Sequence, residues 1–319
     1  MMSKDDDKCS ELNPIAQVIL QGLYDKNSPL HLLVGHHFIL KAIWQDIITY
    51  YKSRIKFGND YDIYCVKVKW GHSYTALDSR SDWFVHFPQP SDININMMPF
   101  VMARSFKESQ LERHLQEYWD EIISQCITHK ELGKIGYLTI HESYVEKGNS
   151  QRRPGIHTES PGLLLLQGGK GRLHTTSKFF GWGHGLVTTR QELQGGIYMV
   201  SNVPNSCKVW NCKILPPEDN CSPDAVGEHG NIEHLRSFIN AKSEMMQANT
   251  MYWITDRTPH EALPLVKQTY RQYVRVVTSQ VSYWYEDHST KNPLGVLPDP
   301  KITTIVKGSK FDGTCYIAD

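Results

Sequence analysis

Two kinds of hydrophobic pattern divide the chain. In the N-terminal third, apolar residues recur at intervals of three and four, which is the spacing of one face of an α-helix. This pattern predicts helices over residues 14–24 and 36–55. A third helix is predicted over 105–126, where Ser105 is placed as the N-cap and Glu108 completes a capping box.

In the rest of the chain, apolar and polar residues mostly alternate, and turns that contain glycine and proline separate the alternating segments. Such alternation is typical of strands with one buried face. Strands are predicted at 61–70, 134–145, 195–202, 206–215, 249–255 and 270–285, with a short helix inside 229–247. We therefore expect an α+β protein, with helices first and then a β body that forms a sandwich or barrel.

Composition narrows the class of protein. Of the 319 residues, 40% are hydrophobic and 21% are charged, which suffices for a sizeable core. Lys+Arg and Asp+Glu both number 34, and no basic stripe occurs, which argues against a nucleic-acid partner. The acidic, polar start is unlike a secretory signal, and the chain contains no apolar run long enough to predict a membrane span. The seven cysteines form no CxxC pair. These features predict a cytoplasmic protein with reduced thiols.

One short motif has the composition of a metal site. "RRPGIHTESPG" contains His157 and Glu159 two positions apart, so in an extended chain both side chains project to the same side. With a second histidine from elsewhere in the sheet they would form the two-histidine, one-carboxylate triad of non-haem iron. The pair alone is weak, because the chain has 15 histidines and His129 and Glu131 repeat the pattern. A surface position for both residues therefore stays open.

A second motif strengthens the metal interpretation. "TDRTPHEALPLVKQTYRQYVRV" places Arg271 eleven residues after His260, inside a predicted strand. Alternation puts Arg271, Tyr273 and Arg275 on one face, and a guanidinium there would grip a carboxylate of a dicarboxylate cosubstrate bidentately. The alternative is an edge strand with its arginines in solvent.

Together, "RPGIHTESPG", "DRTPHEALPL" and "YRQYVRV" resemble the motifs of the Fe(II)/2-oxoglutarate-dependent oxygenases, over roughly residues 134–285. The resemblance implies a double-stranded β-helix, or jelly roll, with helices packed outside it, mainly from the N-terminal third. It implies that His157, Glu159 and His260 bind Fe(II).

The same resemblance implies that Arg271 binds the far carboxylate of 2-oxoglutarate, with Tyr273 where many members carry a serine. Two features depart from the common family pattern. Glu159 replaces the usual aspartate, and Arg275 competes with Arg271 for the cosubstrate role, which alternation alone does not decide. Because Glu159 keeps a carboxylate where halogenases of the family have a small residue, halogenation is not expected.

Candidate substrate contacts lie outside these motifs. Trp182 and His184 belong to a glycine-rich segment, 178–190, that we interpret as a loop walling the pocket. Asn202 is a candidate from the middle of the sheet, and Arg80 is a candidate from the N-terminal part, by analogy of fold alone. For each of them an ordinary packed or turn position is the competing interpretation.

We expect a single domain with four parts: a tail (1–12), a helical and mixed region (13–133), the jelly-roll core (134–285) and a C-terminal extension (286–319). The predicted function is oxidation of an unactivated C–H bond of a small molecule with dioxygen, by hydroxylation or by the related desaturation or ring closure. The alternatives are a protein side-chain hydroxylase, a cupin-like jelly roll that binds a metal or ligand without oxygenase activity, and a structural β-sandwich.

Overall fold

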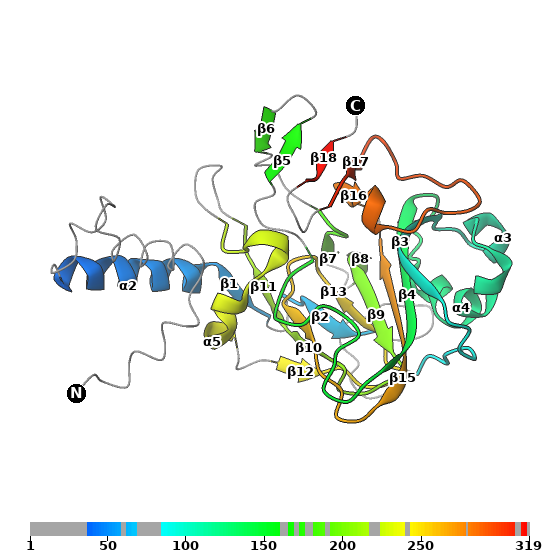
Figure 1. Ribbon diagram of the computed structural model, residues 1–319, viewed down its shortest axis with the longest axis horizontal. Helices are drawn as coiled ribbons and strands as arrows, with labels where there is room; N and C mark the ends of the chain where they lie inside the picture. Colours follow the sequence, from blue (N-terminus) through cyan, green and yellow to red (C-terminus); the bar gives the residue numbers. More distant parts are fainter. Residues whose placement is uncertain are drawn as a thin grey trace.

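The computed structural model is a mixed α+β protein whose strands are mostly antiparallel (Figure 1). It describes residues 37–58, 62–68, 84–159, 165–168, 172–175, 181–188, 192–216, 224–239, 243–278, 280–309 and 314–317. The predicted tail 1–12, the predicted helix 14–24 and Arg80 lie outside the described residues.

A six-stranded antiparallel sheet is the centre of the fold. In spatial order its strands are β2 (Cys65–Lys67), β13 (Tyr252–Ile254), β9 (Ile197–Ser201), β15 (Thr269–Val277), β4 (Ile135–Val145) and β3 (Asn94–Val101). The longest pairing joins β15 to β4, from Thr269 opposite Val145 to Val277 opposite Tyr137. Both strands are rich in β-branched and aromatic residues, and the predicted strand 134–145 is confirmed.

Smaller sheets surround this one. A three-stranded sheet contains β12 (Ser243–Met245), β10 (Cys207–Trp210) and β14 (His260–Ala262). Two two-stranded antiparallel sheets pair β1 (Ile55–Phe57) with β11 (Cys212–Ile214) and β7 (Gly185–Val187) with β8 (Leu193–Gly195). A five-stranded sheet is made by β16 (Tyr283–Tyr285), β17 (Thr304–Lys307), β18 (Tyr316–Ile317), β5 (Leu165–Gly168) and β6 (Arg172–Thr175).

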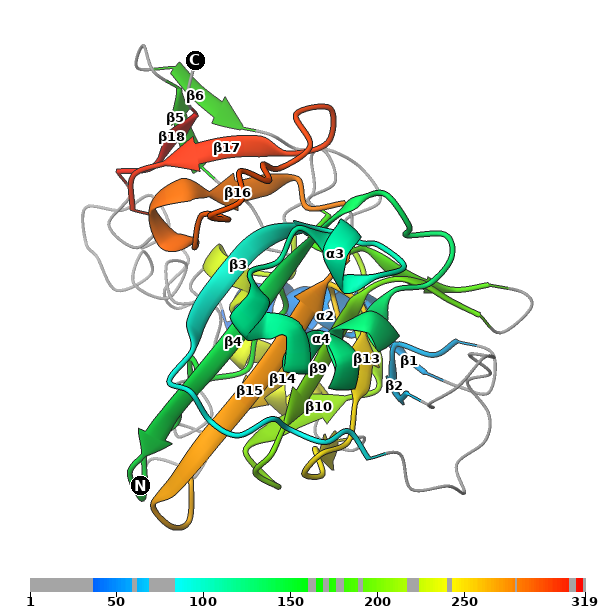
Figure 2. The same ribbon diagram turned by 90° about the vertical axis from the view of Figure 1, so that its right-hand side faces the viewer.

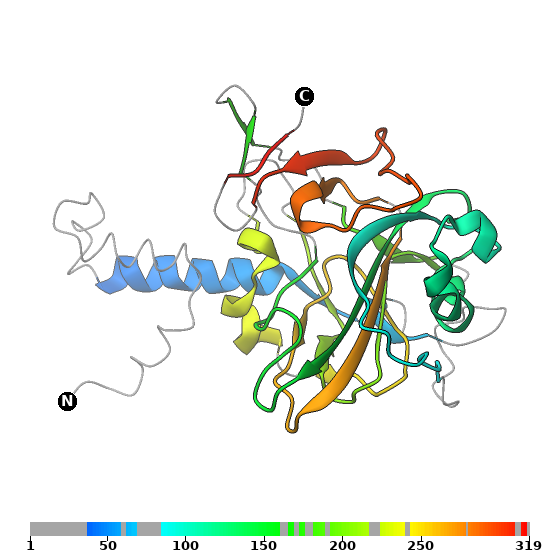
Figure 3. The same ribbon diagram turned by 45° about the vertical axis from the view of Figure 1, so that its right-hand side comes forward.

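Helix α2 (His37–Ser53) confirms the helix predicted over 36–55, and it extends away from the β body (Figures 1 and 3). Its C-terminal end is the anchored part. Tyr51 is buried in a cluster with Trp210 and Leu235, and its ring lies 5.1 Å from the His234 ring. Leu235 ends a 3-10 helix (Glu233–Leu235) that continues into α5 (Arg236–Ile239). The remaining 3-10 helices that the structure describes are Glu228–Gly230 and Glu286–His288, besides two near α4.

Helices α3 (Phe106–Ser109) and α4 (Gln116–Glu121) cover one face of the large sheet (Figure 2). Successive side chains of β15 point alternately to this face of the sheet and to the opposite face. Val274 and Val276 belong to the cluster beneath the helices, whereas Tyr273 and Arg275 line a cavity on the opposite face. The pattern of the strand therefore places apolar side chains under the helices and polar ones in the cavity.

The single helix predicted over 105–126 is wrong. The segment breaks at Gln110, which has a left-handed φ of 54°, and then continues as 3-10 helix Arg113–Leu115, α4 and 3-10 helix Ile123–Cys126. The side chain of Asn292, far along the chain, donates a hydrogen bond of 2.9 Å to the Gln110 carbonyl that the break exposes. Ser105 does occupy the N-cap position of α3, but its side chain makes no capping hydrogen bond.

Several other boundaries also differ from the prediction. The strand predicted over 206–215 is divided at Asn211, whose side-chain oxygen accepts hydrogen bonds from the backbone of Tyr64 and Cys65. Only residues 65–67 of the predicted strand 61–70 form a strand among those described. Part of the predicted glycine-rich loop, at 185–187, is strand β7.

Beneath α4 a buried carboxylate joins the helix to the sheet. Glu142 accepts hydrogen bonds from the Tyr118 hydroxyl, the Gln272 amide and the backbone N–H groups of Ser91 and Ile93. Burial alone would raise the pKa of Glu142, but these donors outweigh it and hold the pKa below its ordinary value. The ionised carboxylate therefore stabilises the fold.

We expect Glu142→Gln to lower the free energy of unfolding by about 2 kcal/mol at pH 7, because the new amide N–H₂ faces donors instead of accepting from them. Since the folded pKa is depressed, the wild-type advantage exists above the unfolded pKa and is lost as the pH falls through the folded value. Urea unfolding at pH 7 and at decreasing pH would measure this difference. A gap between wild type and variant that stays constant down to strongly acid pH would contradict the prediction.

In the described part of the chain no helix is long and apolar enough to cross a membrane.

Candidate functional site

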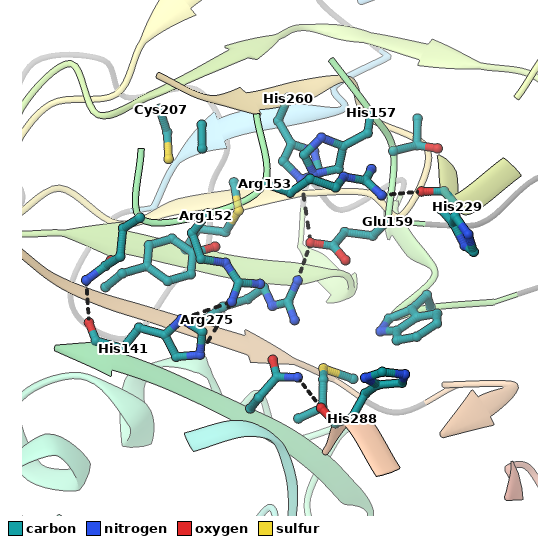
Figure 4. A pocket seen from close by; sticks show the side chains of 18 of the residues that line it. His141, Arg152, Arg153, His157, Glu159, Cys207, His229, His260, Arg275 and His288 are labelled. Carbon is teal, nitrogen blue, oxygen red and sulfur yellow. Dashed lines mark hydrogen bonds and ion pairs between the residues drawn. The ribbon is translucent and has the colours of Figure 1, made fainter. Parts of the chain in front are cut away.

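A cavity of about 480 Å³ lies between the large sheet and the sheet that contains β10 and β14 (Figure 4). The large sheet contributes His141 from β4, Met199 from β9, and Tyr273 and Arg275 from β15. Opposite them stand Cys207 from β10, His260 and Ala262 from β14, and the segment that contains His157 and Glu159. The structure thus brings both sequence motifs to one cavity.

His157 and His260 face each other across a short antiparallel bridge. The N–H of each donates to the carbonyl of the other, at 3.0 and 2.9 Å, and their ring centres are 4.5 Å apart. The Nδ1 atom of His157 lies 2.8 Å from the Gly155 carbonyl oxygen, and that of His260 lies 3.1 Å from the Thr258 carbonyl oxygen. A carbonyl only accepts, so each Nδ1 carries a hydrogen, and each ring is held by its Nδ1 side.

Glu159 points at this histidine pair from two residues beyond His157. Its Oε1 atom lies 3.5 Å from Nε2 of His260 and also accepts a hydrogen bond from Nη1 of Arg275. Burial alone would raise the pKa of Glu159, but Arg275 and the two histidines hold it well below its ordinary value. Burial, reinforced by His260 and Arg153, keeps the pKa of His157 well below 6.5. A neutral imidazole beside an ionised carboxylate is the protonation state that a divalent metal requires.

The spacing of the two imidazoles matches that of neighbouring ligands on one ion. Two rings bound at right angles, each with its nitrogen about 2.1 Å from the metal, would have centres about 4.5 Å apart. Among the described residues, however, no group of three His, Cys, Asp or Glu side chains meets the spacing of a complete metal site. The Glu159 oxygen that faces His260 is also paired with Arg275, so binding of a metal would compete with that ion pair.

Arg271 is the most deeply buried guanidinium of the region, with 1% of its surface exposed. Its donors go to neutral groups: the Ser201 hydroxyl at 3.1 Å, the Gln151 side-chain oxygen at 3.1 Å and the Cys207 sulfur at 3.3 Å. Among the residues that the structure describes, no carboxylate neutralises it. Since Gln151 and Cys207 line the cavity, Arg271 stands directly behind its wall. The solvent-exposed edge strand considered as an alternative is therefore wrong for Arg271, Tyr273 and Arg275, which are all buried.

The cavity residues that the sequence analysis missed include two arginines and a histidine. Arg152 and Arg153 precede the His157 motif, and His141 lies on β4 opposite Tyr273. The Arg152 guanidinium donates to Nδ1 of His141 at 3.1 Å and lies over the Tyr273 ring. Burial, with the charges of Arg152, Arg275 and Arg271, lowers the pKa of His141 to about 3. The only signal for them in the sequence was the "RR" beside the His157 motif. The direction of these two arginine side chains depends on a turn, which hydrophobic periodicity does not describe.

A β-bulge shapes the cavity wall on β3. The register against β4 shifts between Ile95 and Met98, and Met97 has a left-handed φ of 49°. The Thr139 hydroxyl accepts from the Met97 N–H, and the Trp284 indole N–H donates to the Met97 carbonyl, which holds the bulge in place. As a result Met97 lines the cavity while Met98 stays under the helices.

The predicted substrate contacts have different outcomes. Trp182 lines the cavity, and its ring stacks on Tyr285 with centroids 5.8 Å apart. His184 lies outside the cavity lining, 3.5 Å from the buried carboxylate of Asp256. Asn202 is also outside the lining, because its side chain is bonded to Gln272. The expectation that His184 and Asn202 face substrate is therefore corrected, and Arg80 is outside the described residues.

Comparisons with known proteins do not assign the chain to a family. No protein-family model and no curated protein matches the chain. Among solved structures, a match is the crystal structure of AviO1 from Streptomyces viridochromogenes Tue57, with 10% sequence identity and a TM-score of 0.24. It covers 62% of this chain and 74% of that one. A likeness at this level carries no argument about function.

Proposed function

We propose that the protein is an Fe(II)- and 2-oxoglutarate-dependent dioxygenase that oxidises a C–H bond of a small molecule. The observation that carries the proposal is the pairing of His157 with His260. Both Nδ1 atoms are committed to backbone carbonyls, and Nε2 of His260 faces the ionised Glu159 carboxylate at 3.5 Å. Two imidazoles whose Nδ1 atoms are held by backbone carbonyls, beside an ionised carboxylate at the wall of a cavity, have the donor chemistry of a metal site.

The residues of this site fit an iron ion by the chemistry of their donors. His157, His260 and Glu159 would bind one face of the ion and leave the remaining positions toward the cavity. When bound, Fe(II) and 2-oxoglutarate convert dioxygen into an oxidant for the C–H bond, while the cosubstrate leaves as succinate and carbon dioxide. The two backbone carbonyls fix the ring orientations, so the histidines need no reorganisation on binding.

Arg271 is the proposed anchor for the far carboxylate of 2-oxoglutarate. A buried guanidinium with only neutral partners is costly, and a carboxylate would neutralise it through two parallel hydrogen bonds. The Gln151 amide occupies one of those donors, so we propose that the cosubstrate displaces it. Through its amide N–H₂ group Gln151 also donates to the Ser143 hydroxyl and the Arg271 carbonyl, and these two bonds do not use the Arg271 guanidinium.

Arg275 would then serve the metal ligand rather than the cosubstrate. Its Nη1 donates to Glu159 and its Nη2 lies 3.4 Å from the Thr139 hydroxyl, while Nε has no hydrogen-bond partner in the described part of the chain. Such a group keeps the carboxylate ionised and orients it. Two antiparallel sheets that face each other across the cavity also support a jelly-roll core, which belongs to the same proposal.

The test is a 2-oxoglutarate turnover assay with full-length protein, with and without Fe(II), in the presence of candidate metabolites such as amino acids. We expect succinate to form only when Fe(II), 2-oxoglutarate and dioxygen are all present, and to disappear with a chelator. Protein that binds Fe(II) through His157 but neither binds nor consumes 2-oxoglutarate would instead be a cupin-like metal-binding module. Protein that binds no divalent metal would refute the whole proposal.

A further inference from the structure

The cavity wall carries more positive than negative charge. Its lining includes three arginines, Arg152, Arg153 and Arg275, but one carboxylate, that of Glu159. The carboxylate is already paired with Arg275, so the two other guanidiniums remain without an acidic partner among the described residues. Arginine stays charged at any ordinary pH, so this excess is a permanent feature of the cavity.

Of these two arginines, Arg152 is the better placed to bind an anion inside the cavity. Arg153 is exposed and donates to the His229 carbonyl, whereas Arg152 is half-buried on the cavity wall. Arg152 bonds to a ring nitrogen of His141, and its Cζ lies 5.5 Å from the centre of the Tyr273 ring. Figure 4 shows its guanidinium directed into the cavity, toward the region of Glu159 and Arg275. These neutral contacts orient the guanidinium, while the nearby Glu159 carboxylate is ion-paired with Arg275 rather than with Arg152.

Neighbouring positive charges make it less favourable to keep the Arg152 guanidinium charged in the cavity wall. Burial and then the nearby Arg275 lower the pKa of Arg152 from its ordinary value; Tyr273 and Glu159 act in the opposite direction, and Arg271 adds to the lowering. Like charges held together in a half-buried cavity favour the entry of an anion.

Bound iron and cosubstrate would not remove the excess of positive charge on the cavity wall. On the proposed function, the metal adds two positive charges and 2-oxoglutarate brings two negative ones, so they cancel. The far carboxylate of the cosubstrate would be taken by Arg271, behind the wall. Arg152 would still have no acidic partner.

Part of the remaining wall is apolar and aromatic, beside polar residues that include Asn94, Asn96 and His288. The rings of Trp182 and Tyr285 stack within 18° of parallel, and Met97 and Met199 also line the cavity. The Trp182 indole N–H is buried and has no hydrogen-bond partner among the described residues. A ligand for this wall therefore needs an apolar body in addition to its charge.

We propose that the substrate is a small carboxylic acid with an apolar or aromatic body, and that Arg152 binds its carboxylate. The apolar body would lie against Met97, Met199 and the Trp182–Tyr285 pair. This inference rests on the proposed function for the identity of the reaction, but the carboxylate site is defined by the cavity itself. Arg152 would thus fix one end of the substrate, and Tyr273 and His141 would hold Arg152 in position.

The experiment is a calorimetric titration under nitrogen of full-length protein loaded with Mn(II) and excess 2-oxoglutarate. The probes are hexanoate, 3-phenylpropanoate and indole-3-acetate, each compared with its uncharged amide. We expect at least one carboxylate to bind at least about tenfold more tightly than its amide, and Arg152→Gln to remove that preference. Arg152→Lys should restore part of it, because it keeps the charge but loses the two-pronged geometry.

Arg113→Gln is the matched control, because Arg113 is exposed on the 3-10 helix before α4, away from the cavity lining. It should bind the probes as wild type does. Circular dichroism and urea unfolding would establish that each variant is folded. If Arg152→Gln does not fold, the carboxylate-to-amide comparison on wild type and the Arg152→Lys titration decide the question.

The inference is overturned if no carboxylate of the series binds better than its amide, or if folded Arg152→Gln keeps the preference. It is also overturned if Arg152→Gln weakens 2-oxoglutarate instead of the probes, because Arg152 would then hold the cosubstrate. Failure of the proposed function has a different signature, namely that wild type binds no Mn(II) or 2-oxoglutarate. In that case the same titrations are run on the protein alone, where the Arg152 preference is still expected.

Discussion

Protein that carries His157→Ala should lose 2-oxoglutarate turnover by about a thousandfold or more while remaining folded. On the proposed function, the imidazole holds the metal on which the reaction depends, and loss of the metal removes several kcal/mol of stabilisation of the transition state. The fold should survive, because the bridge to His260 is made by backbone atoms that alanine keeps. Succinate formation, Mn(II) affinity and urea unfolding would be measured on the same preparation.

His260→Ala should behave in the same way, since its Nε2 faces the same carboxylate. His114→Ala is the control, because His114 lies half exposed on the surface far from the cavity lining. It should keep wild-type turnover and metal affinity. Metal-analysed His157→Ala protein that still consumes 2-oxoglutarate at the wild-type rate would rule out His157 as a ligand. A variant that is inactive and also unfolded would point to a structural histidine pair.

The sequence identified strand 134–145 and the first part of the predicted strand 270–285, because their patterns reflect a simple physical cause, but the predicted strand 270–285 is divided into β15 and β16, which belong to different sheets. Residues of β4 and β15 alternate between the helix-covered face and the cavity, so period-two patterning describes them. The segment 105–126 has helical spacing, yet it breaks at Gln110. The partner for the exposed carbonyl there is Asn292, which lies 182 residues further along the chain. A break of this kind depends on tertiary contacts that a local pattern does not contain.

The candidate site divides in a similar way. Spacing placed His157 beside Glu159, and strand alternation placed Tyr273 and Arg275 on one face. The pairing of Arg275 with Glu159 required the order of the sheets, since the residues come from separate elements. His141 and Arg152 meet for the same reason: His141 reaches the cavity through the pairing of β4 with β15, and Arg152 through a turn.

For Asn202 and His184 the sequence pattern predicted a substrate contact where the structure shows a contact with another residue of the fold. Polar residues in strands and glycine-rich segments were interpreted as substrate contacts, but both have structural partners. Asn202 is bonded to Gln272 on the neighbouring strand, and His184 faces the buried Asp256. A polar side chain in a predicted strand therefore indicates a buried partner at least as readily as a ligand.

The second large effect concerns the cosubstrate. Arg271→Lys should raise the KM for 2-oxoglutarate by about tenfold or more, with a smaller change in kcat. Lysine keeps the charge but loses the planar pair of donors that grips a carboxylate, and tenfold corresponds to about 1.4 kcal/mol. Among the described residues the hydrogen-bond partners of Arg271 are all neutral, so its charge is available to a carboxylate of the cosubstrate. Titration of 2-oxoglutarate at saturating Fe(II) would measure the change.

Arg275→Lys is the informative comparison, because four residues of strand separate the two Cα atoms by about 13 Å. A five-carbon diacid with one end on the metal has its other end near one of these arginines. Because Arg275 is paired with Glu159, Arg275→Lys should leave the KM for 2-oxoglutarate nearly unchanged and weaken Fe(II) or Mn(II) binding instead. If the KM responds to Arg275→Lys and not to Arg271→Lys, the two roles are exchanged. If neither substitution changes it, 2-oxoglutarate is not held by this strand, and the cosubstrate assignment fails even where the metal site stands.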